Sequence, residues 1–219
     1  MKLSDFLQRI KLAVPNFNDT GVDDTYLTEL LNQAVDQVNL LTKVYRGYTD
    51  FNIEADKRVY ELSSYVPNFL GTDKRGLFFL DSDGNWCELY PKTEIYPDYL
   101  NASSVAIPEW YWIEGDNLGF YPPPSTSQSS GARLYHLKKA TPMSGNDDYP
   151  WGGSSHITIF DALDDAILAY VIWRITPAFG AVTDVDLRYR DYILAAKRGA
   201  RQVNRRRDMH NESTARMRV

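Results

Sequence analysis

One cysteine, Cys87, is all that the 219-residue sequence contains, so an internal disulfide and a multi-cysteine metal site are both excluded. Apolar runs are short as well. None approaches the ~18 residues that a membrane-spanning helix needs, and we expect no membrane association. The first residues lack the continuous apolar stretch and the small-residue cleavage site of a signal peptide. The sequence therefore predicts synthesis in a reducing cytoplasm.

The motifs of catalysis are also missing. The three histidines, His136, His156 and His210, have no G-x-S-x-G motif beside them, which favours surface or structural roles over catalytic ones. Gly152-Gly153 is followed by no Gly-Lys-Ser/Thr triplet, so it is not a phosphate-binding loop. The acidic stretch 81–85 lacks the residue spacing of a calcium loop. We expect a protein that is not an enzyme and has no cofactor or metal.

Charge is unevenly distributed along the chain. The formal net charge is −5, from 24 basic and 29 acidic residues. The segment from Leu187 onward holds ten of the basic and three of the acidic residues, a net of +7. That leaves 14 basic and 26 acidic residues before it, a net of −12. An acidic body followed by a basic segment predicts a separate interaction element at this end of the chain.

Apolar residues at helical spacing predict helices near both ends of the sequence. The first covers residues 3–14, the second about 25–45 and the third 156–174. A last helix runs from about 183 to Asp208, and the residues after it have a composition typical of disorder. Each of the first three helices has an apolar face to bury, and packing them together satisfies all three.

Strand-like runs around polar turns predict β hairpins in the middle of the chain. One hairpin joins residues 51–53 to 58–62, and a second joins 77–80 to 86–90. A third joins 110–113 to 118–121, and residues 133–137 add a further strand. We expect one small, mostly antiparallel β region.

The predicted fold is mainly α with an inserted antiparallel β region (α+β). It consists of a helical bundle formed from both chain ends, β hairpins in the middle, and an extended basic C-terminal helix and tail. Residues 1–47 would hold the N-terminal helices of the bundle, 48–140 the inserted β region with a mobile loop at 122–131, 141–197 the C-terminal helices, and 198–219 a basic docking tail.

Three consecutive aromatic residues, Trp110, Tyr111 and Trp112, lie in one predicted strand. Strand geometry places Trp110 and Trp112 on one face and Tyr111 on the other. Core packing accounts for one face, and the other is a candidate subunit or tail contact because Trp and Tyr are enriched at interfaces. An alternative function is a glycan-binding tail protein that uses this aromatic β region.

The basic segment is the strongest candidate for a binding site. Arg198, Arg201 and Arg205 neighbour one another at helical spacing. The helix dipole favours cations near a helix C-terminus, but it accounts for two or three arginines and not for ten basic residues. The helix before Gly199 has apolar residues to pack, and the stretch after it has few. We therefore predict a docking element over 198–219. A nucleic-acid-binding protein that uses the same basic C-terminal helix is the alternative.

Several segments share their order and character with one known family. They are residues 24–34 (DTYLTELLNQA) in an early helix, the β insertion with Trp110-Tyr111-Trp112, the phrase LGFYPPP at 118–124, a helix that begins with His156, and a final charged helix with a loose tail. In these features, which cover most of the chain, the sequence resembles the head–tail adaptor (connector) proteins of tailed bacteriophages.

The resemblance implies a structural virion protein that forms a ring, a dodecamer, between the portal protein and the tail or nozzle proteins. DNA would pass through the channel of the ring without sequence-specific binding. The protein would assemble in the host cytoplasm and lie in the neck of the virion, at the head–tail junction. The C-terminal helix and tail would reach the portal, a role that falls here on Arg198, Arg201, Arg205, Arg206, Arg207, Met209, Arg216, Met217 and Arg218.

Overall fold

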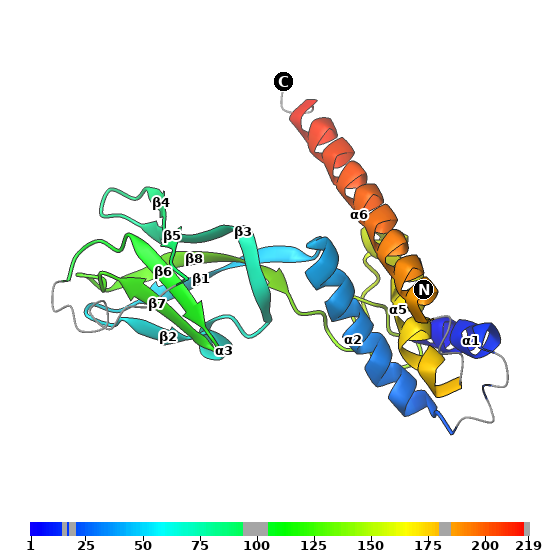
Figure 1. Ribbon diagram of the computed structural model, residues 1–219. Coiled ribbons are helices and arrows are strands. Elements are labelled where there is room, and N and C mark those ends of the chain that lie inside the picture. The colour runs from blue at the N-terminus through cyan, green and yellow to red at the C-terminus, as the bar shows by residue number, and fades with distance from the viewer. Residues whose placement is uncertain (15–16, 18–20, 94–104, 180–184, 217–219) are drawn as a thin grey trace. The chain divides into compact units, whose positions relative to one another are not determined.

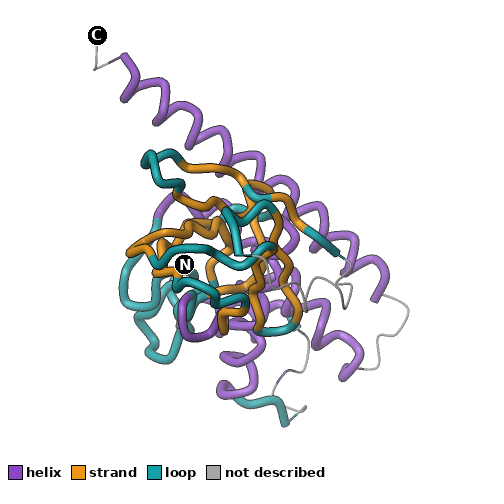
Figure 2. Tube along the Cα trace, turned by 90° about the vertical axis from the view of Figure 1, so that its left-hand side faces the viewer, coloured by secondary structure: helices purple, strands orange, loops and turns teal. Residues whose placement is uncertain are grey.

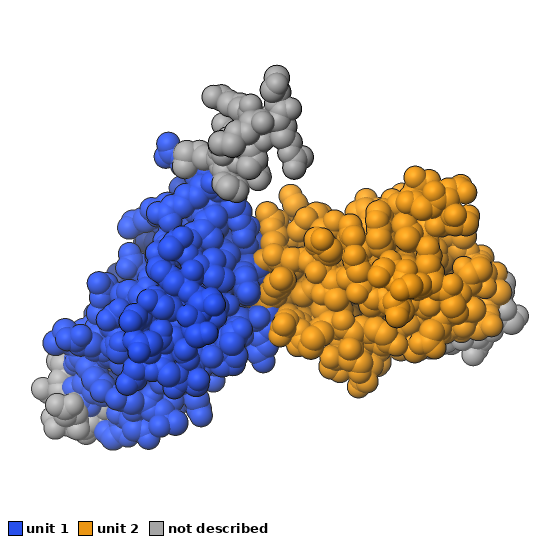
Figure 3. Space-filling model, turned by 180° about the vertical axis from the view of Figure 1, so that it is seen from behind, with its two compact units in different colours: residues 1–45, 139–219 blue, residues 46–138 orange. Residues whose placement is uncertain are grey.

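Residues 1–14, 17, 21–93, 105–179 and 185–216 are described by the computed structural model. The chain divides into two units (Figure 3). Unit 1 combines residues 1–45 with 139–219, and unit 2 consists of residues 46–138. Each unit has a hydrophobic core of its own.

Unit 1 is built from helices that surround α5. This helix contacts α1, α2 and α6, and its apolar residues lie at the centre of the core. The helices are α1 (Leu3–Ala13), α2 (Asp24–Thr42), α5 (Asp164–Ile175) and α6 (Val185–Arg216), with the 3-10 helices η2 (Thr158–Leu163) before α5 and η3 (Thr176–Phe179) after it. Helices α2 and α6 run in the same direction, from lower right to upper left in Figure 1.

Both ends of α2 are fixed by side-chain hydrogen bonds. Asp23 caps the N-terminus by accepting a hydrogen bond from the Tyr26 backbone N–H at 2.7 Å. The helix ends at Lys43, which has the left-handed φ of 54°. The buried amide of Asn39 then donates to the Tyr45 carbonyl at 2.9 Å and accepts from the Tyr45 N–H at 2.8 Å. These bonds satisfy the backbone groups at the point where the chain leaves unit 1.

Unit 2 consists of two four-stranded sheets and the short helix α3 (Leu62–Tyr65). One sheet has the order β1-β8-β3-β4 and the other has the order β2-β7-β6-β5. The strands are β1 (Arg46–Ile53), β2 (Val59–Glu61), β3 (Phe69–Leu80), β4 (Trp86–Glu88), β5 (Tyr90–Pro91), β6 (Trp110–Glu114), β7 (Asn117–Tyr121) and β8 (Gln128–Lys138). All neighbouring strands pair antiparallel except β5 and β6, which pair parallel.

The predicted fold class is wrong. The described chain has few helices and eight strands in two sheets, so it is not a helical bundle with hairpins in the middle. Local turn signals revealed β3–β4 and β6–β7, but the predicted hairpin of β1 with β2 does not form, because β1 pairs with β8 and β2 pairs with β7. Strand β8 starts at Gln128, inside the segment expected to be a mobile loop. Pairings between distant segments leave no local turn signature, which is why the sequence pattern missed them.

His136 connects β8 to β1 inside unit 2. Its ring is buried, with Nε2 at 3.1 Å from the Thr49 hydroxyl and Nδ1 at 3.1 Å from the Leu137 carbonyl oxygen. In the neutral ring Nδ1–H donates to the carbonyl and Nε2 accepts from the hydroxyl. Burial lowers the pKa of His136 below its ordinary value, so the folded chain resists protonation of this ring.

We expect the free energy of unfolding to fall as the pH drops below about 6.5, the ordinary histidine pKa. Below that pH the unfolded chain binds a proton that folded His136 resists, so protonation favours unfolding. Urea titrations of the full chain at pH 8 and at lower pH values measure the effect, and the His136→Gln variant should lose this part of the pH dependence. An unchanged dependence in that variant would contradict the assignment.

Candidate docking site

Helix α6 is anchored to unit 1 along one narrow face. Tyr192, Ala196, Gly199 and Val203 lie on this face, and all four are buried. Gly199 allows the closest approach, because a Cβ atom at that position would overlap the Ala162 carbonyl oxygen in η2. The packing therefore continues past Gly199 to Val203, which is fully buried.

Basic side chains outnumber acidic ones on the rest of the described α6 surface, where Asp186 and Asp191 are the exposed acidic residues. Figures 1 and 2 show α6 as one long helix that leads to the C-terminal end of the chain. Within the part of the chain that the structure describes, its exposed basic side chains form no ion pairs with carboxylates. They are Arg188, Arg190, Lys197, Arg198, Arg201, Arg205 and Arg206. Arg198 and Arg206 line a pocket together with Asp161 and Asp165, so their charges are partly balanced within the chain.

The predicted docking arginines differ in what they touch within their own chain. Arg198, Arg201 and Arg205 are exposed. Arg206 Nη1 donates to the Thr158 carbonyl oxygen at 3.3 Å, and the guanidinium of Arg207 lies 5.6 Å from the centre of the Phe160 ring. The side chains of Met209 and Arg216, and the whole of Met217 and Arg218, lie outside the described residues. The docking role of these nine residues stays a prediction.

Of the three aromatic residues of β6, two are buried and one is half-buried. Tyr111 and Trp112 are 5% and 6% exposed, and the ring of Trp112 covers Gly119 of β7. Trp110 is half-buried, with the Lys92 ammonium 4.2 Å from its ring centre. Their role as a subunit or tail contact also stays a prediction.

Two leucines face outward in the part of α6 that was predicted to belong to the helical bundle. Leu187 and Leu194 of α6 are 55% and 58% exposed. Their exposure could have been predicted from helical spacing, because both lie on the side of the helix opposite Tyr192 and Ala196. The apolar composition of this part of α6 suggests burial. Whether each side chain is buried depends instead on its angular position around the helix.

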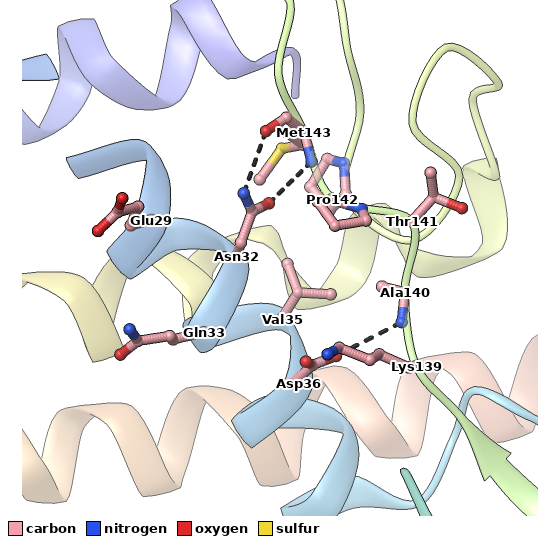
Figure 4. A pocket seen from close by; sticks show the side chains of 11 residues that line it. Glu29, Asn32, Gln33, Val35, Asp36, Lys139, Ala140, Thr141, Pro142 and Met143 are labelled. Atoms are coloured by element: carbon pink, nitrogen blue, oxygen red, sulfur yellow. Dashed lines mark hydrogen bonds between the residues drawn. The ribbon is translucent and has the colours of Figure 1, made fainter. Parts of the chain in front are cut away.

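A pocket of about 310 Å³ opens beside α2 (Figure 4). Asn32 builds one wall, because its amide donates to the Met143 carbonyl oxygen at 3.0 Å and accepts from the Met143 N–H at 2.8 Å. Val35 and Pro142 supply apolar lining, and Glu29 and Asp36 add carboxylates. The remaining lining residues are Gln33, Lys139, Ala140, Thr141 and Pro150.

Asp36 has few partners in this pocket. Its carboxylate accepts a hydrogen bond from the Ala140 N–H at 3.4 Å, which is long for such a bond. Burial raises the pKa of Asp36, and the Ala140 hydrogen bond and the Lys139 charge oppose that shift only in part. A cation from outside the chain would compensate the charge of this carboxylate.

A second groove, of about 500 Å³, lies between α2, α5 and α6. Four aromatic rings form a contiguous cluster there: Tyr170, Trp173, Tyr189 and Tyr192. Burial raises the pKa of Tyr192 to about 12. The charged residue in its lining is Arg174.

The described side chains give no sign of metal chemistry or of a membrane anchor. Among them, no three histidine, cysteine or acidic residues are grouped so that they could hold a metal ion. Within the same part of the chain, none of the helices combines the length and the apolar character that crossing a bilayer requires.

A helical unit with exposed basic and apolar side chains, interrupted in the sequence by a β unit, fits the class of structural proteins that act through contacts with partner proteins. The particular family follows from comparison with family models. The model of the SU10 adaptor protein matches residues 1–218, so the chain belongs to this family of phage head–tail adaptors. The earlier resemblance is thereby confirmed. The protein is a structural component of the virion neck, where adaptors associate with portal and tail proteins. A search of curated proteins found no match.

Proposed function

We propose that the protein assembles as a ring, of twelve copies by the family resemblance, that joins the portal to the tail and lines part of the DNA channel. The segment 198–219, which comprises the end of α6 and the residues after it, docks on the portal. The observation that carries this proposal is the exposed basic surface of α6, which forms no ion pairs among the described residues. It contrasts with the net charge of −12 on the residues before Leu187.

The negative charge of the residues before Leu187 also affects the proposed DNA channel. A wall built from an acidic body repels DNA phosphates, which allows DNA to pass without being held. Many copies in one ring also multiply a weak contact, because each added attachment is intramolecular once the first has formed. A modest affinity of each copy for the portal is then sufficient for stable attachment of the ring.

Deleting residues 204–219 should abolish attachment of the protein to portal rings while unit 1 stays folded. The truncation keeps the buried face of α6 intact, since Val203 is its last described buried residue. Co-sedimentation with purified portal rings measures attachment, and urea unfolding measures the integrity of the fold. Normal attachment of the truncated protein would rule out the docking role of this segment.

A double substitution tests the contribution of the arginine charges without removing the segment. Arg201→Ala with Arg205→Ala should weaken attachment by at least about tenfold, which corresponds to ~1.4 kcal/mol per ring. Exposed charge pairs contribute about 0.2–1 kcal/mol each, and every copy in the ring loses two. Arg9→Ala with Lys74→Ala is the matched control, because it removes the same charge from exposed sites elsewhere.

A further inference from the structure

The outward face of α6 carries a regular stripe. Leu187, Arg190, Leu194, Lys197 and Arg201 follow one another at steps of three, four, three and four residues, so they align on one side of the helix. All five are exposed. This spacing is that of a helix that packs along a second helix, with apolar and basic residues in alternation.

Helix α2 carries a stripe of the same spacing. Tyr26, Glu29, Gln33, Asp36 and Leu40 also follow one another at steps of three, four, three and four residues. Asp36 is half-buried and the other four are exposed. Neither Glu29 nor Asp36 has an ion-pair partner among the described residues. The two carboxylates are seven residues apart, as are Arg190 and Lys197, which is about 10.5 Å along each helix axis.

We infer that the outward stripe of α6 packs in parallel along the outward stripe of α2 in a second copy of this chain, with Leu194 entering the pocket beside Gln33. In this register Glu29 meets Arg190 and Asp36 meets Lys197. Tyr26 meets Leu187, and the stem of Arg201 covers Leu40. Val35, Pro142 and Met143 line the pocket that receives the leucine (Figure 4).

The charges of the lining residues favour this pocket, and not the aromatic groove between α2, α5 and α6, as the binding site of the α6 stripe. The aromatic groove is lined by Arg174, which repels a basic stripe. The pocket beside α2 has two carboxylates and one cation, Lys139, in its lining. The apolar residues of the α6 stripe fit either site, but Arg190 and Lys197 meet carboxylates only beside α2, since the lining of the aromatic groove includes none.

The parallel direction follows from the arrangement of the helices within one copy. In the view of Figure 1 both α2 and α6 run from lower right to upper left in unit 1, so a small rotation between copies leaves α6 of one pointing in the same general direction as α2 of the next. For a ring of twelve that rotation is roughly 30°. The contact joins two different surfaces, so it is heterologous and can propagate around a ring. The inference therefore rests on the proposed ring and identifies its subunit contact.

Cysteine cross-linking tests this contact. In a Cys87→Ser background, the variant with both Gln33→Cys and Leu194→Cys should form a ladder of covalent multimers on oxidation, up to the size of the ring. The two positions face each other in the proposed register, within the ~4.4–6.8 Å between Cα atoms that a disulfide spans. Each single variant should give no ladder. Gln8→Cys with Leu194→Cys is the matched control, because Gln8 is exposed on α1 outside the stripe.

The experiment is run on the free protein and with portal rings added, and native mass spectrometry measures assembly in each sample. Rings with a ladder support the inference. Rings without a ladder, or with an equal ladder from the Gln8 control, overturn the subunit contact and leave the proposed ring standing. No ring and no ladder in either condition overturn both.

Discussion

Gly199→Val should detach α6 from unit 1 and lower the free energy of unfolding by about 3 kcal/mol or more. A side chain at this position overlaps the Ala162 carbonyl oxygen, which is a backbone atom of η2 and has no rotamer through which to escape. The helix must then move outward, and the burial of Val203 one turn later is lost with it. Urea unfolding of the full chain measures the change.

Limited trypsin digestion separates local detachment from global unfolding. The arginines of α6 become cleavable when the helix leaves the surface, before the rest of the chain unfolds. Gln202→Val is the control, since it places the same β-branched residue at an exposed position of the same helix. Equal stability of the two variants would show that the close contact at Gly199 contributes little.

Gly119→Val should destabilise unit 2 by about 1–3 kcal/mol through overpacking. Gly119 in β7 is the register partner of Trp112 in β6, and the indole lies directly over the position that a Cβ atom would take. Here the obstructing group is a side chain, so the ring can rotate away and become exposed. We expect a smaller stability loss than at Gly199, together with a red shift of tryptophan fluorescence.

Gly145→Val is the matched control for Gly119. A Cβ atom on Gly145 meets the Asp148 carboxylate at 3.6 Å, which is ordinary contact. This variant should change neither fluorescence nor stability appreciably. If Gly119→Val also left fluorescence and stability unchanged, the contact of the Trp112 ring with Gly119 would contribute nothing to the stability of unit 2.

These two glycines fix the surfaces on which the proposed contacts depend. Gly199 sets the height of α6 above η2, and with it the outward direction of Leu194 and Arg201. Gly119 lets Trp112 lie flat on its own sheet, which leaves Trp110 as the more exposed aromatic of β6. Loss of either close contact changes which side chains are presented, even where the fold survives.

Part of this architecture was predictable from local patterns. The apolar stripes of α1 and α2 gave both helices to within a few residues. The turns at 81–85 and 114–117 identified β3 with β4 and β6 with β7. Prediction failed where a strand pairs with a distant partner. Strand β8 lies between β1 and β3, and nothing near it in the sequence indicates either neighbour.

The sequence by itself determined the charge contrast between the body and α6, the exclusion of an internal disulfide, and the family resemblance that the SU10 adaptor model confirmed. These depend on composition and residue order, which folding does not change. Only the tertiary structure decided which residues of α6 face outward and that the evenly spaced charges of α2 and α6 form no ion pairs among the described residues. The physical reason is that burial depends on what packs against each face of a helix. In this chain the packing partners of α6 come from η2, α5 and α2, which its own sequence does not specify.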